Sequence, residues 1–201
     1  MIKEFWDKRF EADEFIYSEN PNQFVKSFVE NAPKTGKILF TAEGEGRNAV
    51  FAARNDWTVF ACDFSESGQK KALRLAAKNN VSIDYQLLDL NDILTHYPME
   101  SFDVIAVVFN HFPPEMRQKF HASLPSLLKK GGKIIMEVFN KRQLPKTSGG
   151  PKREDMLYSK ALLVADFADM TMEYLEETKI ILNEGAFHQG EAEVVRMIAV
   201  K

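Results

Sequence analysis

The stretch of this chain that most constrains its fold is residues 37–48, which contains two glycines separated by one residue, Gly44 and Gly46. Residues 38–41 are apolar or β-preferring, and a segment with helical character, residues 47–54, follows the glycines. The pattern predicts a strand, a tight turn and the start of a helix. Because glycine has no Cβ and the first N–H groups of a helix are unpaired, such a turn lets the backbone approach a small polar ligand.

An acidic residue follows the glycine turn at the sequence spacing seen in nucleotide-binding folds. The spacing Gly44-x-Gly46-x-x-Ala49 fits the G-x-G-x-x-G/A pattern of nucleotide-binding folds. A second apolar run, residues 57–62, ends at Asp63, about 20 residues beyond the glycines, where such folds place the acid that binds ribose hydroxyls. The pattern predicts a cofactor that contains adenosine. The alternative is an ordinary βαβ unit in which Asp63 caps the next helix.

Composition and charge exclude several classes of protein. A chain of 201 residues fits one domain, residues 1–201, with a full core. The formal net charge of -3 gives no electrostatic reason to bind nucleic acid. The single cysteine, Cys62, excludes a disulfide framework and a multi-cysteine metal site, and we expect no metal. With a charged N-terminus and no apolar run near the ~18 residues of a membrane span, we expect a cytoplasmic protein without membrane partners; the sequence predicts no oligomeric state.

The order of the remaining elements predicts the fold class. Five alternations of strand and helix are followed by two strands joined by residues 183–190. We therefore predict an α/β fold with a single, doubly wound, Rossmann-like mixed sheet of seven strands, a C-terminal antiparallel hairpin and helices on both faces. The expected strands are residues 38–41, 57–62, 81–88, 102–109, 133–139, 172–182 and 192–200, and the expected helices include residues 23–31, 65–80, 115–128 and 156–167.

Two segments outside this alternation are expected to cover the ligand site. Residues 1–35 are predicted to form a helical cap, in which Phe5, Trp6 and Phe10 recur at helical spacing and either roof the cofactor or simply pack against the sheet. Residues 140–155 are polar, rich in Gly and Pro, and longer than an ordinary connection. We interpret them as a functional loop on the substrate side.

Polar residues follow the third and fourth predicted strands, at the edge where open α/β sheets bind ligands. Asp89 either reaches an adenine amino group or only caps the next short helix. His111 is the first candidate for proton transfer, because a polar pair, Asn110 and His111, leaves a buried strand there. The alternative for His111 is a packed or capping histidine.

Taken together, these motifs give a chain that resembles the class I S-adenosylmethionine-dependent methyltransferases over essentially its whole length. The resemblance rests on residues 42–48, 63–65, 89–90 and 129–133. More narrowly, the opening Phe-Trp-Asp-Lys-Arg-Phe and the closing Glu-Gly-Ala-Phe-His-Gln-Gly resemble the small bacterial branch related to tellurite-resistance and thiopurine methyltransferases.

The resemblance implies S-adenosylmethionine as cofactor and a role for each matching position. The turn would face the methionine part of the cofactor, Asp63 the ribose, Phe64 the adenine ring, and the backbone of Phe109 the sulfonium. This family usually has an acid within the first strand and a glycine at the start of the turn, where this chain has Phe40 and Ala42; Glu43 is the candidate for the missing carboxylate. The cofactor-binding residues implied are Ala42, Glu43, Gly44, Gly46, Asn48, Asp63, Phe64, Ser65, Asp89, Leu90 and Phe109.

The predicted reaction is methyl transfer to a small molecule. A sulfonium is a good electrophile, so positioning and water exclusion supply most of the acceleration, and a base is needed only for a protonated acceptor. Soft nucleophiles such as thiolates, selenide or tellurium species need no base and are favoured. Tyr17, Arg117 and His188 are candidates for the substrate pocket, with His111 as a tentative catalytic residue, although Arg117 fits the solvent face of its helix equally well.

Two other functions remain open from the sequence. The glycine spacing and Asp63 also permit a nicotinamide-dependent oxidoreductase. Phe40 and Ala42 leave open a catalytically silent adenosylmethionine-binding protein. A DNA substrate is excluded, because residues 110–114 contain the letters of the amino-methylating motif in the wrong arrangement and the chain has no basic face.

Overall fold

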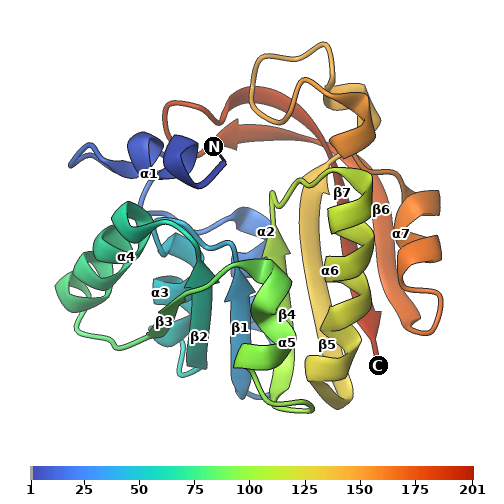
Figure 1. Cartoon of the computed structure of the whole chain (residues 1–201), viewed down its shortest axis with the longest axis horizontal. Helices are drawn as coiled ribbons and strands as arrows, with labels where there is room; N and C mark the ends of the chain where they lie inside the picture. The colour runs from blue at the N-terminus through green and yellow to red at the C-terminus, as the bar shows by residue number, and fades with distance from the viewer. Residues whose placement is uncertain (1) are drawn as a thin grey trace.

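The computed structural model describes residues 2–201 of the chain, and these residues form a seven-stranded sheet in the order β3-β2-β1-β4-β5-β7-β6 (Figure 1). Strands β1 to β5 pair in parallel, and β7 is antiparallel to both β5 and β6. The strands are β1 (Lys37–Thr41), β2 (Thr58–Asp63), β3 (Asp84–Leu87), β4 (Phe102–Val108), β5 (Leu128–Phe139), β6 (Thr171–Asn183) and β7 (Gln189–Val200). The predicted fold class, including the C-terminal antiparallel pair, is confirmed.

Helices cover both faces of this sheet because its central strands bury apolar side chains on both sides. On β1, Leu39 packs into a core shared with α6 and α7, whereas Ile38 and Phe40 pack into a second core shared with α2, α3 and α4. The helices are α1 (Ile2–Phe10), α2 (Gln23–Asn31), α3 (Arg47–Ala53), α4 (Glu66–Lys78), α5 (Ile93–His96), α6 (Pro114–Leu127) and α7 (Lys160–Asp166), with 3-10 turns η1 (Leu90–Asp92), η2 (Lys141–Gln143) and η3 (Glu154–Met156).

Several predicted boundaries were wrong, and three of them have a clear local reason. The strand expected from residue 81 begins only at Asp84, because Val81 donates its N–H to Ala76 O and closes α4 instead of joining the sheet. The helix expected from residue 156 begins at Lys160, after Ser159 accepts a capping hydrogen bond on its side chain. Strand β5 begins five residues early, because the residues expected to stop α6 continue directly into the sheet.

The carboxyl ends of the parallel strands form one covered edge. In Figure 1, α1, the tip of the β6–β7 hairpin and the chain that follows β5 all gather beyond these strand ends. The hairpin tip contacts the segment after α1, where Ala186 N donates to Ile16 O at 3.0 Å. A Cβ on Gly185 would lie 2.0 Å from the same carbonyl oxygen, so this contact requires glycine. Among the described residues, no helix combines the length and the apolar character needed to cross a lipid bilayer.

Candidate functional site

The turn after β1 adopts an unusual backbone that its glycines permit. Gly44 and Gly46 have φ values of 60° and 84°. Ala42 also lies in the left-handed region, with φ 47°, which costs an L residue roughly 1–2 kcal/mol. Ala42 therefore adopts a conformation that favours glycine, the residue type that the resembled family has there. Phe40, the other departure from that family, is fully buried and packs in the core.

Glu43 uses its carboxylate to cap α3. Its Oε1 accepts hydrogen bonds from Asn48 N at 2.9 Å and Ala49 N at 2.8 Å, and its Oε2 accepts from Asn48 Nδ2 at 3.3 Å. Burial raises the pKa of Glu43 to about 7. The carboxylate of Glu43 thus holds the start of the helix, and its predicted contact with the amino group of a cofactor stays a prediction.

Asp63, at the end of β2, holds the same turn from the other side. Its Oδ2 accepts from Gly44 N at 3.0 Å and its Oδ1 accepts from Ser65 N at 2.8 Å. Burial raises the pKa of Asp63 to about 6, although these backbone donors oppose the shift. Each carboxylate oxygen can accept a further hydrogen bond, so Asp63 retains acceptor capacity for hydroxyl groups.

The other predicted cofactor residues lie along the same edge in different environments. Asp89 is exposed and accepts hydrogen bonds from Asn91 N at 2.9 Å and Asn91 Nδ2 at 2.8 Å, as in the capping alternative. Leu90 is buried in the core, and Phe64 is half-buried. Asn48 Oδ1 accepts from Asn22 N at 2.8 Å.

Helix α1 lies directly over the glycine turn. A Cβ on Gly44 would meet the ring of Phe10 at 3.0 Å. Asp7 fastens the helix, because its Oδ1 accepts from Ser65 Oγ at 2.7 Å and from Ser67 N at 3.3 Å. Ser65 also caps α4 by accepting from Gly68 N. The aromatic N-terminal segment and the predicted ribose-binding region are therefore joined by side-chain hydrogen bonds.

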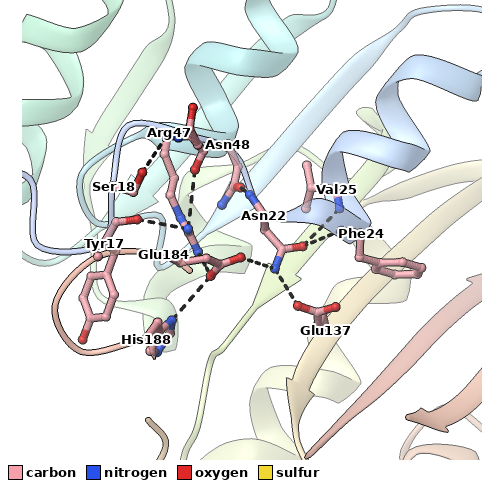
Figure 2. A network of polar contacts seen from close by, with 12 residues as sticks. Tyr17, Ser18, Asn22, Phe24, Val25, Arg47, Asn48, Glu137, Glu184 and His188 are labelled. Atoms are coloured by element: carbon pink, nitrogen blue, oxygen red, sulfur yellow. Dashed lines mark hydrogen bonds and ion pairs between the residues drawn. The ribbon is translucent and has the colours of Figure 1, made fainter. Parts of the chain in front are cut away.

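A buried polar network ties the cap to the sheet and to the hairpin tip (Figure 2). Arg47 Nη2 donates to Glu184 Oε2 at 2.7 Å, and its Nη1 donates to Tyr17 O at 3.1 Å. Asn22 Nδ2 donates to Glu137 Oε1 at 2.5 Å and to Glu184 Oε1 at 3.3 Å. Sequence reasoning missed this network. A visible signal was Glu137, a lone carboxylate within the apolar run of β5.

Two of the predicted pocket residues meet beside this network. The rings of Tyr17 and His188 have centroids 4.7 Å apart, and Phe109 lies 4.7 Å from His188 on another side. His188 Nδ1 lies 3.5 Å from Glu184 Oε2. Burial lowers the pKa of His188, against the raising effect of Glu184. Phe109 adopts φ 51°, a strained conformation for an aromatic residue that costs of order 1–3 kcal/mol.

Arg117 lies elsewhere. It is buried, so the solvent-face alternative was wrong, and its Nε donates to Asp166 Oδ2 at 2.9 Å. His121 Nδ1 lies 2.7 Å from the same carboxylate oxygen. Arg117 borders a separate cavity of about 440 Å³, lined also by Pro114, Lys141, Glu154, Asp155, Leu157 and Leu162. The structure thus separates Arg117 from the group formed by Tyr17 and His188.

His111 is packed between main-chain groups. Its Nδ1 lies 2.8 Å from Met156 O, and its Nε2 accepts from Phe139 N at 3.3 Å. A carbonyl only accepts and an N–H only donates, so these partners require a neutral ring protonated on Nδ1. Burial lowers the pKa of His111 to about 4. Both nitrogens are used, which matches the packing alternative and gives no support to the predicted proton transfer.

The comparisons with known proteins point to one class. Residues 38–132 match the family model described as a methyltransferase domain. The chain is 31% identical over 118 residues to thiocyanate methyltransferase 1 of Brassica oleracea. The aligned region covers 58% of this chain and 50% of that protein. It is 20% identical over 132 residues to 2-heptyl-1-hydroxyquinolin-4(1H)-one methyltransferase of Mycobacteroides abscessus. That alignment covers 65% of this chain and 58% of the other protein. The chain spans about half the length of the curated relatives it matches.

Solved structures share the fold over nearly the whole chain. A protein studied for the conversion of a disulfide bond into a thioacetal group during echinomycin biosynthesis has a TM-score of 0.83 at 13% identity, covering 100% of this chain and 92% of its own. TehB from Haemophilus influenzae has a TM-score of 0.71 at 16% identity, covering 99% and 66%. Magnesium protoporphyrin IX methyltransferase from Synechocystis PCC 6803, with bound SAH, has a TM-score of 0.70 at 14% identity, covering 100% and 97%.

Residues 38–132 thus match a methyltransferase domain, and the solved structures share the fold of the whole chain. The sequence resemblance implies S-adenosylmethionine as the cofactor of such a domain. The residues present fit this group, because Asp63 keeps acceptor capacity for hydroxyl groups at the end of β2, beside the glycine turn.

Proposed function

We propose that the protein transfers the methyl group of S-adenosylmethionine to a small, soft nucleophile, with thiolates and related sulfur, selenium or tellurium anions as the favoured class. The observation that carries this proposal is the packing of His111, the first candidate for proton transfer, whose two ring nitrogens are both held by main-chain groups. This histidine has no free nitrogen to take a proton from an acceptor.

Among the described residues, the titratable rings packed around Phe109 and Phe139 are poor bases near neutral pH. Burial lowers the pKa of both His111 and His188, and His111 has both ring nitrogens in hydrogen bonds. Burial also raises the pKa of Tyr17, whose phenol remains protonated. A general base works best when its pKa is close to the working pH. The site therefore suits an acceptor that arrives as an anion, and the likeness to a thiocyanate methyltransferase supports the same class.

We propose that the cofactor lies along the carboxyl ends of β1, β2 and β4. When bound, S-adenosylmethionine supplies an electrophilic methyl group. Asp63 would accept from ribose hydroxyls, Phe64 would lie along the adenine, and the bare backbone at Gly44 and Gly46 would take the methionine part. The proposed set is completed by Ala42, Glu43, Asn48, Ser65, Asp89, Leu90 and Phe109.

The flanking segments are proposed to exclude water from the reaction. Residues 1–35 would act as the cap over the cofactor and residues 140–155 as the substrate-side loop, within one domain of residues 1–201. In support, Phe10 rests on Gly44, and Tyr17 contacts His188 on the hairpin tip. Excluding water strengthens electrostatic interactions and prevents hydrolysis. The branch related to tellurite-resistance and thiopurine methyltransferases is proposed on the terminal motifs and on the fold shared with TehB.

Calorimetric titration with S-adenosylmethionine and S-adenosylhomocysteine tests the cofactor, and NAD serves as the control ligand. Headspace gas chromatography then tests for methylated products from sodium hydrosulfide and sodium thiocyanate, with phenol and aniline as matched oxygen and nitrogen acceptors. We expect binding of the first two ligands and methylation of the sulfur acceptors only. Preferential methylation of phenol or aniline would contradict the soft-acceptor proposal, and cofactor binding without any product would favour a catalytically silent binding protein.

A further inference from the structure

A turn within the loop after β5 lies directly against His188. Gly149 and Gly150 have φ values of 130° and 84°, which L side chains rarely adopt. A Cβ on Gly149 would lie 2.7 Å from His188 Cδ2 and 3.0 Å from His188 Nε2. A Cβ on Gly150 would lie 2.9 Å from Phe139 Cδ2. Both the backbone conformation and the available space therefore require glycine at these two positions.

A buried amide holds this turn in place. Gln143 is 1% exposed, and its Nε2 donates to Ser148 Oγ and to Gly149 O, each at 3.0 Å. Its Oε1 accepts from Glu193 N on β7 at 2.9 Å. Ser148 Oγ in turn donates to Glu191 O at 2.6 Å. The turn is thus fastened to the same strand pair that carries His188 at its tip.

The contacts of His188 show that the position of the turn affects the position of its imidazole ring. Its Nδ1 faces Glu184, and its ring contacts the rings of Tyr17 and Phe109. The remaining edge of the ring, Cδ2 and Nε2, faces Gly149. Movement of the turn would therefore release one side of the imidazole. The ring of Phe109, stacked 4.6 Å from that of Phe139, belongs to the same group.

We propose that Gln143 is a positioning residue, and that it acts through the Gly149–Gly150 turn to set His188 against Phe109 and so to shape the methyl-acceptor site. This inference rests on the proposed function for the nature of the acceptor, a small sulfur anion. It assigns Gln143 and the two glycines to acceptor recognition and not to cofactor binding, because their contacts lie on the β5–β7 side of the site.

The test compares matched pairs of variants of the full chain. Gly149→Ala is paired with Gly131→Ala, because Gly131 also has a positive φ of 75°, but a Cβ there would have no described atom within 4 Å. Gln143→Ala is paired with Gln118→Ala at an exposed position of α6. Three measurements are made on each variant: calorimetry gives the affinity for S-adenosylhomocysteine, steady-state kinetics give KM and kcat for sodium hydrosulfide, and NMR with labelled histidine gives the ring resonances of His188.

We expect Gly149→Ala and Gln143→Ala to shift the His188 ring resonances and to raise the KM for hydrosulfide about tenfold or more, as for a misplaced contact group. Affinity for S-adenosylhomocysteine should stay unchanged, and the two control variants should match the parent in all three measurements. Unchanged His188 resonances in the folded variants, or an equal rise of KM in Gly131→Ala, would overturn the proposal.

The two proposals fail in different ways. If the parent protein does not bind S-adenosylhomocysteine, the proposed function fails, while the NMR comparison still decides whether Gln143 positions His188. If the parent binds the cofactor and methylates hydrosulfide but the variants retain its KM, the positioning role alone is wrong. If Gln143→Ala does not fold, Gln143→Glu, which keeps the acceptor atom for Glu193 N and removes the amide donor, is used in its place.

Discussion

Replacing Asn22 tests the buried network most directly, because one side chain performs two separable tasks there. Its Oδ1 caps α2 by accepting from Phe24 N and Val25 N, and its Nδ2 donates to the carboxylates of Glu137 and Glu184. Asn22 is fully buried. Loss of a cap costs about 1 kcal/mol. Loss of a hydrogen bond to a buried charge costs ~1.5–3 kcal/mol.

We expect Asn22→Ala to lower the free energy of unfolding by about 2.5–4 kcal/mol, the sum of the cap and one strong charged hydrogen bond. The contact with Glu184, at 3.3 Å, is the weaker of the two and is not counted separately. The measurement is urea denaturation followed by circular dichroism at pH 7.5. The control is Asn31→Ala on the exposed end of α2, for which we expect a change within about 0.5 kcal/mol.

Asn22→Asp separates the two tasks, because Asp caps a helix as well as Asn does but brings a third carboxylate to Glu137 and Glu184. Burial already raises the pKa of Glu137. Added repulsion raises it further, so the folded variant binds more protons than the unfolded chain. Its stability relative to the parent should therefore fall as pH rises above the ordinary pKa of a glutamate. A cost below ~1 kcal/mol for Asn22→Ala, or a pH-independent difference for Asn22→Asp, would refute this account of the network.

Three further outcomes are expected. Asp63→Ala should weaken S-adenosylhomocysteine binding by about 1–3 kcal/mol in calorimetry, because hydroxyl groups and the Gly44 N–H lose their acceptor; unchanged affinity would remove Asp63 from the site. Glu43→Gln should gain ~1–3 kcal/mol of stability relative to the parent as pH rises from 5.5 to 8, measured by urea denaturation. The pKa of Glu43 is raised to about 7, so the parent loses stability when Glu43 ionises, whereas Gln does not titrate. A difference independent of pH would contradict this. His111→Ala should lower the melting temperature, as expected from the loss of its bonds to Met156 and Phe139, while leaving the shape of the pH–rate profile between pH 5 and 8 unchanged; loss of a limb of that profile would restore a proton-transfer role.

The order of the helices and strands could be predicted from the sequence, but several of their boundaries could not. The glycine turn, the apolar strands and the helix caps each depend on residues a few positions apart, so their order predicted the sheet and its reversed last strand. The three boundary errors came from the same limit, since a pattern of propensities does not show which backbone groups a neighbouring element has already paired. Val81 is an example, because its N–H is used by α4 and not by the sheet.

The candidate site divides in the same way. Asp63 and the two turn glycines were predicted from spacing alone, and the structure brings them together. Arg117 and His111 were chosen for their residue types near strand ends, and the tertiary structure directs them to Asp166 and to main-chain groups. Residue type indicates what a side chain is able to do, whereas its partners decide which of those tasks it performs.

The sequence by itself determined the class of fold and the glycine turn after β1, because both follow from local backbone preference and from the burial of regularly spaced apolar residues. Only the tertiary structure decided which segments cover the strand ends and which partners the buried charged groups have. Asn22 and Glu137 are 115 positions apart, and Arg47 and Glu184 are 137 positions apart. Such pairs form because a buried charge must find a partner once the chain has closed around it, and the identity of that partner depends on the packing of the whole sheet.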